Sequence, residues 1–119
     1  MQLIGIDIIE IARIKRAITR HGENFLKRVY TEPEIELYRT KPASLAARFA
    51  GKEAVIKALQ TKGASLREIE ILSEPDGRPQ VKLHSKAKRQ AADLGLARLA
   101  ISLSHSRKYA IAFAIGEAK

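Results

Sequence analysis

The spacing of apolar and polar positions divides the first half of the chain into one strand followed by helices. Leu3–Ile6 is an apolar run that predicts a buried strand. From Ile8 the apolar residues recur with a helical period, and His21-Gly22 ends this predicted helix. Cap residues and glycines predict three more helices. These are Glu23–Val29, Glu32–Tyr38 with Thr31 as N-cap and Pro33 in its first turn, and a longer helix from Pro42 to about Gln60 that Gly63 stops.

The second half of the chain has mainly strand patterns with tight turns between them. Pro75-Asp76-Gly77 is a strong turn signal, and Ser104–Arg107 is a short turn between two segments of alternating character. The predicted elements are the strands Glu68–Leu72, Gln80–Leu83, Arg98–Leu103 and Lys108–Ile115, and a helix Ser85–Leu94 with Gly95 just past its end. We therefore expect an α+β fold, with a mainly antiparallel sheet packed on one long and several short helices.

The composition is typical of one soluble domain. The chain has 119 residues, of which 45% are hydrophobic and 29% charged, so we expect a single domain spanning residues 1–119. Its apolar runs are too short to cross a bilayer, and Met1 leads into the first strand without a basic segment or cleavage site. The absence of cysteine excludes disulfides, thiolate zinc sites and cysteine nucleophiles. We expect a cytoplasmic protein that neither spans nor enters a membrane.

The chain is strongly basic, with a formal net charge of +9 that both halves share. Such a field attracts nucleic acid, anionic lipid, an acidic protein or a phosphate-rich cofactor. Arg13, Arg16 and Arg20 share one face of the first helix, although such a stripe is usually a solvated surface. With three Tyr, three Phe and no Trp, the chain is poorly equipped to stack on single-stranded nucleic acid.

Asp7 interrupts the apolar run from Leu3 to Ile9, where a charge requires a partner. One interpretation makes it the N-cap of the following helix, with Glu10 completing a capping box. The other makes it a carboxylate at the end of a strand that is ready to bind a hard cation. From this stretch alone the cap is the simpler interpretation.

The long helix carries charges where an ordinary surface helix would not place them. Its large apolar residues share one face and its alanines another, which permits close backbone packing. Glu53 and Lys57, one helical turn apart, fall between the two faces, and Lys52 projects into the large apolar face. A simple Glu–Lys surface pair explains neither this placement nor Lys52, so the pattern favours a functional role. The two faces are Leu45, Phe49, Ile56 and Leu59, and Ala46, Ala47, Ala50, Ala54 and Ala58.

The turn between the last two strands combines hydroxyls, an imidazole and two cations, Ser102-Leu103-Ser104-His105-Ser106-Arg107-Lys108. This set suits an anionic group, although a serine-rich turn with a chance histidine is the commoner explanation. No Asp or Glu lies close in sequence to orient His105, so a serine-hydrolase triad has little support.

Taken together, these segments resemble the small, single-domain holo-acyl-carrier-protein synthases, group one of the phosphopantetheinyl transferases. The resemblance rests on Gly5-Ile6-Asp7-Ile8, on Arg48–Lys57 and on Ser102–Ser106, in the order and spacing of that family, with Asp76–Pro79 as its glycine-proline turn. It extends from near residue 3 to near residue 115. The departure is Gly51, where many relatives carry alanine.

The resemblance implies the phosphopantetheinyl-transferase fold and the transfer of 4'-phosphopantetheine from coenzyme A to a serine of an acidic apo acyl carrier protein, with release of 3',5'-ADP, in fatty-acid biosynthesis. It implies Asp7 and Glu53 as Mg2+ ligands, with Glu53 and Lys57 catalytic and Lys57 facing the pyrophosphate. Further implied are a coenzyme A pocket, a carrier-docking surface and a homotrimer with its sites at subunit interfaces. The implied pocket residues are Lys57, Ser104, His105 and Ser106, and the docking residues are Arg13, Arg20 and Arg28.

The residues suit such chemistry because phosphoryl transfer requires charge neutralisation more than covalent help. The proton of the carrier serine could pass to Glu53, to Lys57 or to a metal-bound water. Glu34 is a possible helper, although an exposed glutamate in the first turn of a helix is the simpler interpretation. The alternatives are a basic nucleic-acid-binding module without catalysis, which has no use for half-buried carboxylates, and a small Mg2+-dependent phosphohydrolase.

Overall fold

The structure of this chain, a computed structural model, describes residues 1–119 and confirms the α+β fold. Its strands form two antiparallel sheets, a three-stranded sheet in the order β1-β5-β4 and a two-stranded sheet of β2 and β3. The elements in chain order are β1 (Gln2–Glu10), α1 (Ile11–His21), α2 (Glu23–Val29), α3 (Glu32–Tyr38), α4 (Pro42–Leu59), a 3-10 turn η1 (Leu66–Glu68), β2 (Ile69–Ser73), β3 (Pro79–Leu83), α5 (Ser85–Asp93), β4 (Leu96–His105) and β5 (Tyr109–Ala118).

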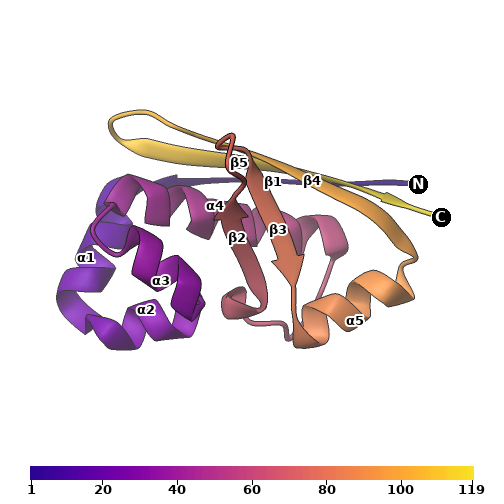
Figure 1. The fold of residues 1–119 in the computed structure, drawn as a ribbon, viewed down its shortest axis with the longest axis horizontal. Coiled ribbons are helices and arrows are strands. Elements are labelled where there is room, and N and C mark those ends of the chain that lie inside the picture. Colours follow the sequence, from indigo (N-terminus) through magenta and orange to yellow (C-terminus); the bar gives the residue numbers. More distant parts are fainter.

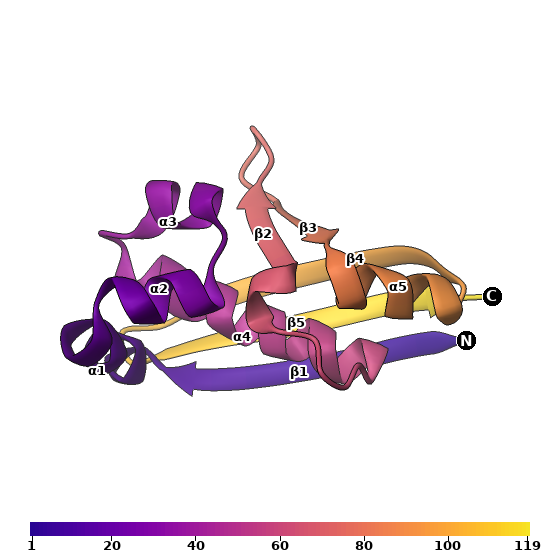
Figure 2. The same cartoon turned by 90° about the horizontal axis from the view of Figure 1, so that it is seen from below.

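All the helices lie on one side of the three-stranded sheet, as Figure 1 shows. Seen from below in Figure 2, α4 runs along this sheet, and the β2–β3 hairpin crosses α4 from the other side. The two chain ends meet at one end of the molecule, where the Met1 ammonium donates to the carbonyl of Ala118 at 2.8 Å. α4 is therefore the central element, since it contacts both sheets.

The interface between α4 and the sheet is built from small residues. The buried side of β5 consists of Ala110, Ala112, Ala114 and Ala118 with Gly116, and Ala46, Ala50, Ala54 and Ala58 of α4 are buried as well. Small side chains let a helix and a strand approach closely, as the alanine face of the long helix predicted. The large residues that alternate with these alanines on β5 consequently point to the opposite face.

That opposite face of the three-stranded sheet is apolar and uncovered. Six large apolar side chains on β1 and β5 are between 39% and 62% exposed. Single exposed apolar residues are common on protein surfaces, but a group of six is not. Ile6 lies directly across from Phe113, and Ile8 across from Ile111, in the register of the two strands. The six are Ile4, Ile6, Ile8, Tyr109, Ile111 and Phe113.

The boundary between β1 and α1 differs from the prediction, which started the helix at Ile8. The strand continues to Glu10, because its last residues pair with β5, including Ile8 with Ile111 and Glu10 with Tyr109. The exposed Ile8 and the buried Ile9 follow the strand alternation. Asp7 therefore lies inside β1, and the predicted capping role for it is wrong: the N-cap of α1 is Glu10, which makes no side-chain cap bond.

Glu34 and Lys52 form a buried ion pair, so the interpretation of Glu34 as an exposed surface residue is wrong. Both side chains are fully buried, and the Lys52 ammonium lies 2.8 Å from Glu34 Oε1. Burial lowers the pKa of Lys52, and the Glu34 carboxylate opposes that shift. Lys52 thus faces the core between α4 and β2, and the structure gives it a partner there.

No helix of the structure is both long enough and apolar enough to cross a membrane. The cytoplasmic location stays a prediction.

Candidate active site

Asp7 and Lys57 meet where β1 passes alongside α4. The Lys57 ammonium donates to Asp7 Oδ1 at 3.0 Å and to the main-chain carbonyl of Ile6 at 2.9 Å. The Asp7 side chain is only 19% exposed, whereas that of Lys57 is 55% exposed. The lysine therefore reaches from the helix to the strand at an open edge of the fold.

Gly5 makes this approach possible. A Cβ at this position would lie 1.9 Å from the carbonyl oxygen of Ala54 and 2.9 Å from the backbone nitrogen of Ala58. Only a residue without a side chain lets β1 lie so close to α4. The contact places Asp7, two residues further along the strand, beside the turn of α4 that carries Glu53 and Lys57.

Glu53 is half-buried and lies within electrostatic reach of Asp7. Burial raises the pKa of Glu53 above its ordinary value, the negative charge of Asp7 raises it further, and the Lys57 ammonium acts in the opposite direction. Two carboxylates thus repel one another across the β1–α4 contact while one lysine partly offsets them. An additional cation there would relieve that repulsion.

The serine-rich turn lies apart from this cluster within one chain. His105 pairs with Ala110 of β5, whereas Asp7 pairs with Ala112, so His105 is two strands across the sheet and two residues further along. Strand spacing makes this a separation of about 10 Å or more. Neighbouring residues of a strand face opposite sides, so Ser104 and His105 point away from each other.

At the tip of the β4–β5 hairpin, the Ser106 hydroxyl accepts hydrogen bonds from the backbone nitrogens of Lys108 at 3.3 Å and Tyr109 at 3.2 Å. It therefore holds the turn, which is the ordinary use of a serine there. His105 and Ser106 also line a hollow of about 580 Å³ with Lys15 and Arg107. The lining combines three cationic or ionisable side chains with a hydroxyl.

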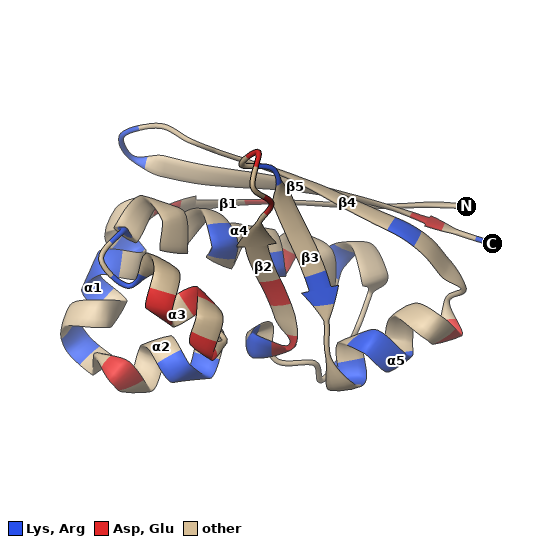
Figure 3. Cartoon of the chain, in the orientation of Figure 1, with Lys and Arg blue, Asp and Glu red and all other residues tan.

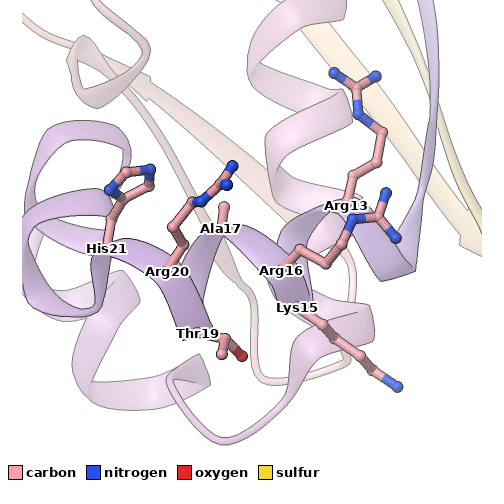
Figure 4. A pocket seen from close by; sticks show the side chains of 7 residues that line it. All are labelled: Arg13, Lys15, Arg16, Ala17, Thr19, Arg20 and His21. Carbon is pink, nitrogen blue, oxygen red and sulfur yellow. The ribbon is translucent and has the colours of Figure 1, made fainter.

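The arginines of the first helix are exposed, and Figure 3 marks the Lys and Arg positions along α1 in blue. Arg13 and Arg20 line one hollow of about 730 Å³ together with Arg16, and their guanidinium groups extend from the same side of α1 in Figure 4. Arg28 lies on α2 and does not line that hollow. None of these four arginines forms an ion pair in the structure, so their charge is available to a partner.

The comparisons with known proteins identify the family. Residues 3–114 match the model of the 4'-phosphopantetheinyl transferase superfamily. The chain belongs to this superfamily. It is 50% identical to a holo-[acyl-carrier-protein] synthase of Dehalococcoides mccartyi over 118 residues, which cover 98% of this chain and 99% of that protein. A holo-[acyl-carrier-protein] synthase of Ruminiclostridium cellulolyticum is 49% identical, over 95% of this chain and 90% of that protein.

The solved structures agree with the family assignment. The holo-[acyl-carrier-protein] synthase of Helicobacter pylori, in complex with coenzyme A, has a TM-score of 0.87 and 36% identity, over 97% of this chain and all of that one. The corresponding coenzyme A complex from Chronobacterium ammoniagenes has a TM-score of 0.88 and 27% identity, over 100% of this chain and 98% of that one. The predicted family, the phosphopantetheinyl-transferase fold and the prediction of an enzyme are thereby confirmed, and a binding module without catalysis is set aside.

The transferase carries two carboxylates, and not a full set of protein ligands, at its candidate metal site. No group of three His, Cys, Asp or Glu side chains that could hold a metal ion occurs in the structure. Mg2+ suits such a site, because it commonly takes one or two carboxylates and completes its shell with water and substrate phosphate oxygens. The repulsion between Asp7 and Glu53 is consistent with this cation.

Two buried polar groups of the transferase were not assigned from sequence. Arg48, within the family motif, donates to the Ile71 carbonyl at 3.1 Å and to the hydroxyls of Tyr38 and Ser73, each at 2.9 Å, and so fixes β2 against α3 and α4. Glu34 was interpreted as a possible helper in the reaction or as an exposed glutamate in the first turn of a helix, and not as a buried residue. The available signal for its burial was Lys52, a lysine on an apolar helix face that requires a buried carboxylate as partner.

Proposed function

We propose that this chain transfers the 4'-phosphopantetheine group of coenzyme A to a serine of an apo acyl carrier protein, in a Mg2+-dependent reaction that releases 3',5'-ADP and serves fatty-acid biosynthesis. The similarity to holo-[acyl-carrier-protein] synthases, one of them solved with coenzyme A, supports the substrates. The observation that carries the proposal is the cluster of Asp7, Glu53 and Lys57 at the β1–α4 contact. We also propose that residues 1–119 act as one domain, since α4 packs against both sheets.

In the proposed step, the serine oxygen of the carrier attacks the phosphorus that bears the pantetheine arm. A new P–O bond forms, the pyrophosphate P–O bond to 3',5'-ADP breaks, and the serine proton passes to a base. Asp7 and Glu53 would hold the Mg2+, which when bound supplies positive charge to the pyrophosphate oxygens. The protein supplies position and charge.

Lys57 suits the role of charge stabiliser better than that of base. Its side-chain nitrogen already donates to two oxygens, Asp7 Oδ1 and the carbonyl of Ile6, and the same donor geometry suits the oxygens of a pyrophosphate. A pyrophosphate at the cluster would offer that ammonium a further acceptor. Asp7 is already paired with the Lys57 ammonium, so we propose Glu53 as the protein group that accepts the serine proton.

The test is the intact mass of apo carrier protein after incubation with the chain, coenzyme A and Mg2+. The proposal predicts a carrier heavier by one phosphopantetheine group, and no gain after EDTA. Asp7→Asn and Glu53→Gln should each reduce turnover by about 100-fold or more while leaving the fold intact. Asp93→Asn, an exposed carboxylate on α5, is the matched control and should change nothing.

Two outcomes would contradict the proposal. Phosphate or 3',5'-ADP released without a carrier would indicate a phosphohydrolase. Unchanged turnover in either site variant would remove that residue from the metal site.

We propose that His105, Ser104 and Ser106 contribute to the coenzyme A pocket from the hairpin tip of a neighbouring copy. Support comes from the basic, hydroxyl-bearing lining of the hollow at this tip and from its distance to Asp7 within one chain. His105→Ala should raise the KM for coenzyme A more than the KM for the carrier.

We propose that the exposed apolar face of the three-stranded sheet mediates this assembly as a homotrimer. A contiguous set of six exposed large apolar residues is characteristic of a protein–protein interface. Phe113→Glu should convert the assembly to a monomer in light scattering and abolish turnover. A monomeric wild-type chain with full activity would refute the assembly.

We propose that Arg13, Arg20 and Arg28 dock the acidic carrier, because they are exposed and unpaired on adjacent helices. Arg13→Glu should raise the KM for the carrier, and should do so less at high salt, while the KM for coenzyme A stays constant. Equal changes in both KM values would contradict docking at Arg13.

A further inference from the structure

The buried ion pair of Glu34 and Lys52 joins four elements behind the candidate active site. The Lys52 ammonium donates to Glu34 Oε1 at 2.8 Å, to the carbonyl of Leu66 at 3.2 Å and to the carbonyl of Ile69. These three acceptors match the three hydrogens of an ammonium group. One side chain of α4 is thereby bonded to α3, to η1 and to the start of β2.

Glu34 is equally well satisfied. Its Oε1 also accepts from the backbone nitrogen of Thr31 at 2.8 Å, and its Oε2 accepts from the backbone nitrogen of Ile71 at 2.8 Å. The capping box of α3 thus serves a second purpose, because it holds the carboxylate rigidly where Lys52 needs it. No buried side-chain polar atom in the structure lacks a partner.

Stability alone does not account for this pair. Replacing a buried ion pair by apolar side chains of similar size is often neutral or stabilising, because two charges have to be removed from water. The hydrogen bonds of a buried pair do, however, require a fixed geometry, whereas apolar contacts do not. The position of the pair in the fold therefore indicates which element it orients.

The side of α4 that faces β1 and β5 carries mainly small side chains. It packs on the sheet through alanines, and its contact with Gly5 is a contact between backbones. Interlocking side chains normally set the rotation and height of a packed helix, and alanine on alanine provides little of this. Lys52 provides a directional anchor on the far side. Glu53, the next residue, points about 100° away toward β1.

We propose that the Glu34–Lys52 pair is a positioning device for the active site: it fixes the rotation and axial height of α4 and so sets the separation of Glu53 from Asp7. The inference rests on the proposed function for its consequence, since these are the two carboxylates proposed to hold the metal. Neither Glu34 nor Lys52 touches the substrate in this account. Both act through α4.

The test compares Lys52→Met, Glu34→Gln and the double variant with the wild-type chain. In the double variant neither position of the pair carries a buried charge, so its stability to urea should exceed that of Lys52→Met, which leaves the Glu34 carboxylate without its partner. Mn2+ alone serves as the probe, because it takes the same oxygen ligands as Mg2+ and its free form is counted by electron paramagnetic resonance. The Kd for Mn2+ should rise about tenfold in Lys52→Met and stay raised in the double variant.

The matched control is Val29→Ala, a buried position on α2 that loses core packing and takes part in none of the hydrogen bonds of the pair. It should lose stability and keep the wild-type Kd for Mn2+. A double variant that binds Mn2+ within a factor of two of the wild-type chain, after regaining stability, would show that the pair has only a structural role.

A crystal structure of the double variant provides a readout that does not depend on metal. We expect α4 to be rotated or shifted against β1, with Glu53 further from Asp7. Unchanged carboxylate geometry would overturn the inference. If the wild-type chain binds no Mn2+, the metal assignment fails by itself, and the crystal structure still decides the role of the pair.

Discussion

Gly5→Ala should be among the most disruptive single-methyl changes in this chain. Gly5 does not have a positive φ, so alanine is permitted by the local backbone, and the effect has to come from contacts. The added Cβ would lie 1.9 Å from the oxygen and 2.9 Å from the carbon of the Ala54 carbonyl. These atoms belong to the backbone of α4, which has no rotamer to change.

The magnitude follows from what has to move. Contacts of a Cβ below 3.0 Å essentially do not occur, so β1 and α4 have to separate by about 1 Å at this point. Overpacking of a core usually costs about 1–3 kcal/mol. Because a backbone clash cannot relax through a side chain, we expect about 3 kcal/mol or more here. Asp7 would move away from Glu53 at the same time.

Gly116→Ala is the matched control, a buried glycine of the same sheet. Its added Cβ would meet the Leu96 Cδ1 methyl at 2.9 Å and the Arg98 carbonyl oxygen only at 3.5 Å. A half-buried leucine at the end of a strand can turn away, and a strand gains from losing a glycine. We expect a change within about 1 kcal/mol.

Urea unfolding followed by far-ultraviolet circular dichroism suits a chain without tryptophan. Turnover measured where both variants remain folded should fall in Gly5→Ala and not in Gly116→Ala. Equal midpoints for the two variants, or a loss below about 1 kcal/mol in Gly5→Ala, would refute the role of the β1–α4 contact.

Two further predictions concern stability. Gly51→Ala should keep full activity and a free energy of unfolding within about 1 kcal/mol of the wild-type value. Alanine favours the helix more than glycine does, and its Cβ would crowd only the methyl ends of Ile71, Ile101 and Leu103, at 2.7–3.1 Å. A loss above about 2 kcal/mol in urea unfolding would show that these methyls cannot yield. Burial raises the pKa of Glu68, but hydrogen bonds from the backbones of Ser65, Ala87 and Lys86 outweigh it, and the folded pKa lies below the ordinary 4.5. Its contribution is therefore present above pH 4.5 and lost as the pH falls through the folded value. The stability difference between Glu68→Gln and the wild-type chain should shrink between about pH 7 and about pH 3.5, and a constant difference would contradict this.

The helices with strong local signals could be predicted from sequence. α2 and α3 have the predicted bounds, and α3 has its capping box of Thr31 and Glu34. The helix from Pro42 ends at Leu59, with Gln60 as its left-handed C-cap. In each case the residues that start and stop the helix are its sequence neighbours, so no distant contact was needed to place it.

The end of β1 could not be predicted in this way. Ile8 continues the alternation of Ile4 and Ile6, and it also fits a helical period with Ile11 and Ile14. Both patterns satisfy the local sequence. The choice depends on β5, about 100 residues away in the chain, whose backbone pairs with β1 as far as Glu10.

The pairing of Asp7 with Glu53 was likewise beyond local reasoning. Read alone, Asp7 fitted a helix cap, and only resemblance to the transferase family joined it to Glu53. The structure brings Asp7, Glu53 and Lys57 together through a backbone contact at Gly5. No periodicity in the sequence predicts such a contact between backbones.

The small residues at the centre of the fold connect the site with the uncovered face of the sheet. β1 has to approach α4 closely for Asp7 to reach Glu53, and this requires Gly5 on the strand and alanines on α4 and β5. Strand alternation then forces the large side chains, such as Ile6 and Phe113, to the other face, where they are exposed. The packing that would bring the two carboxylates together is therefore also the packing that leaves an apolar face to be covered. In the proposed assembly another copy of the chain covers this face. The geometry of the site and the self-association of the chain therefore depend on the same residues, Gly5 and the alanines of α4 and β5.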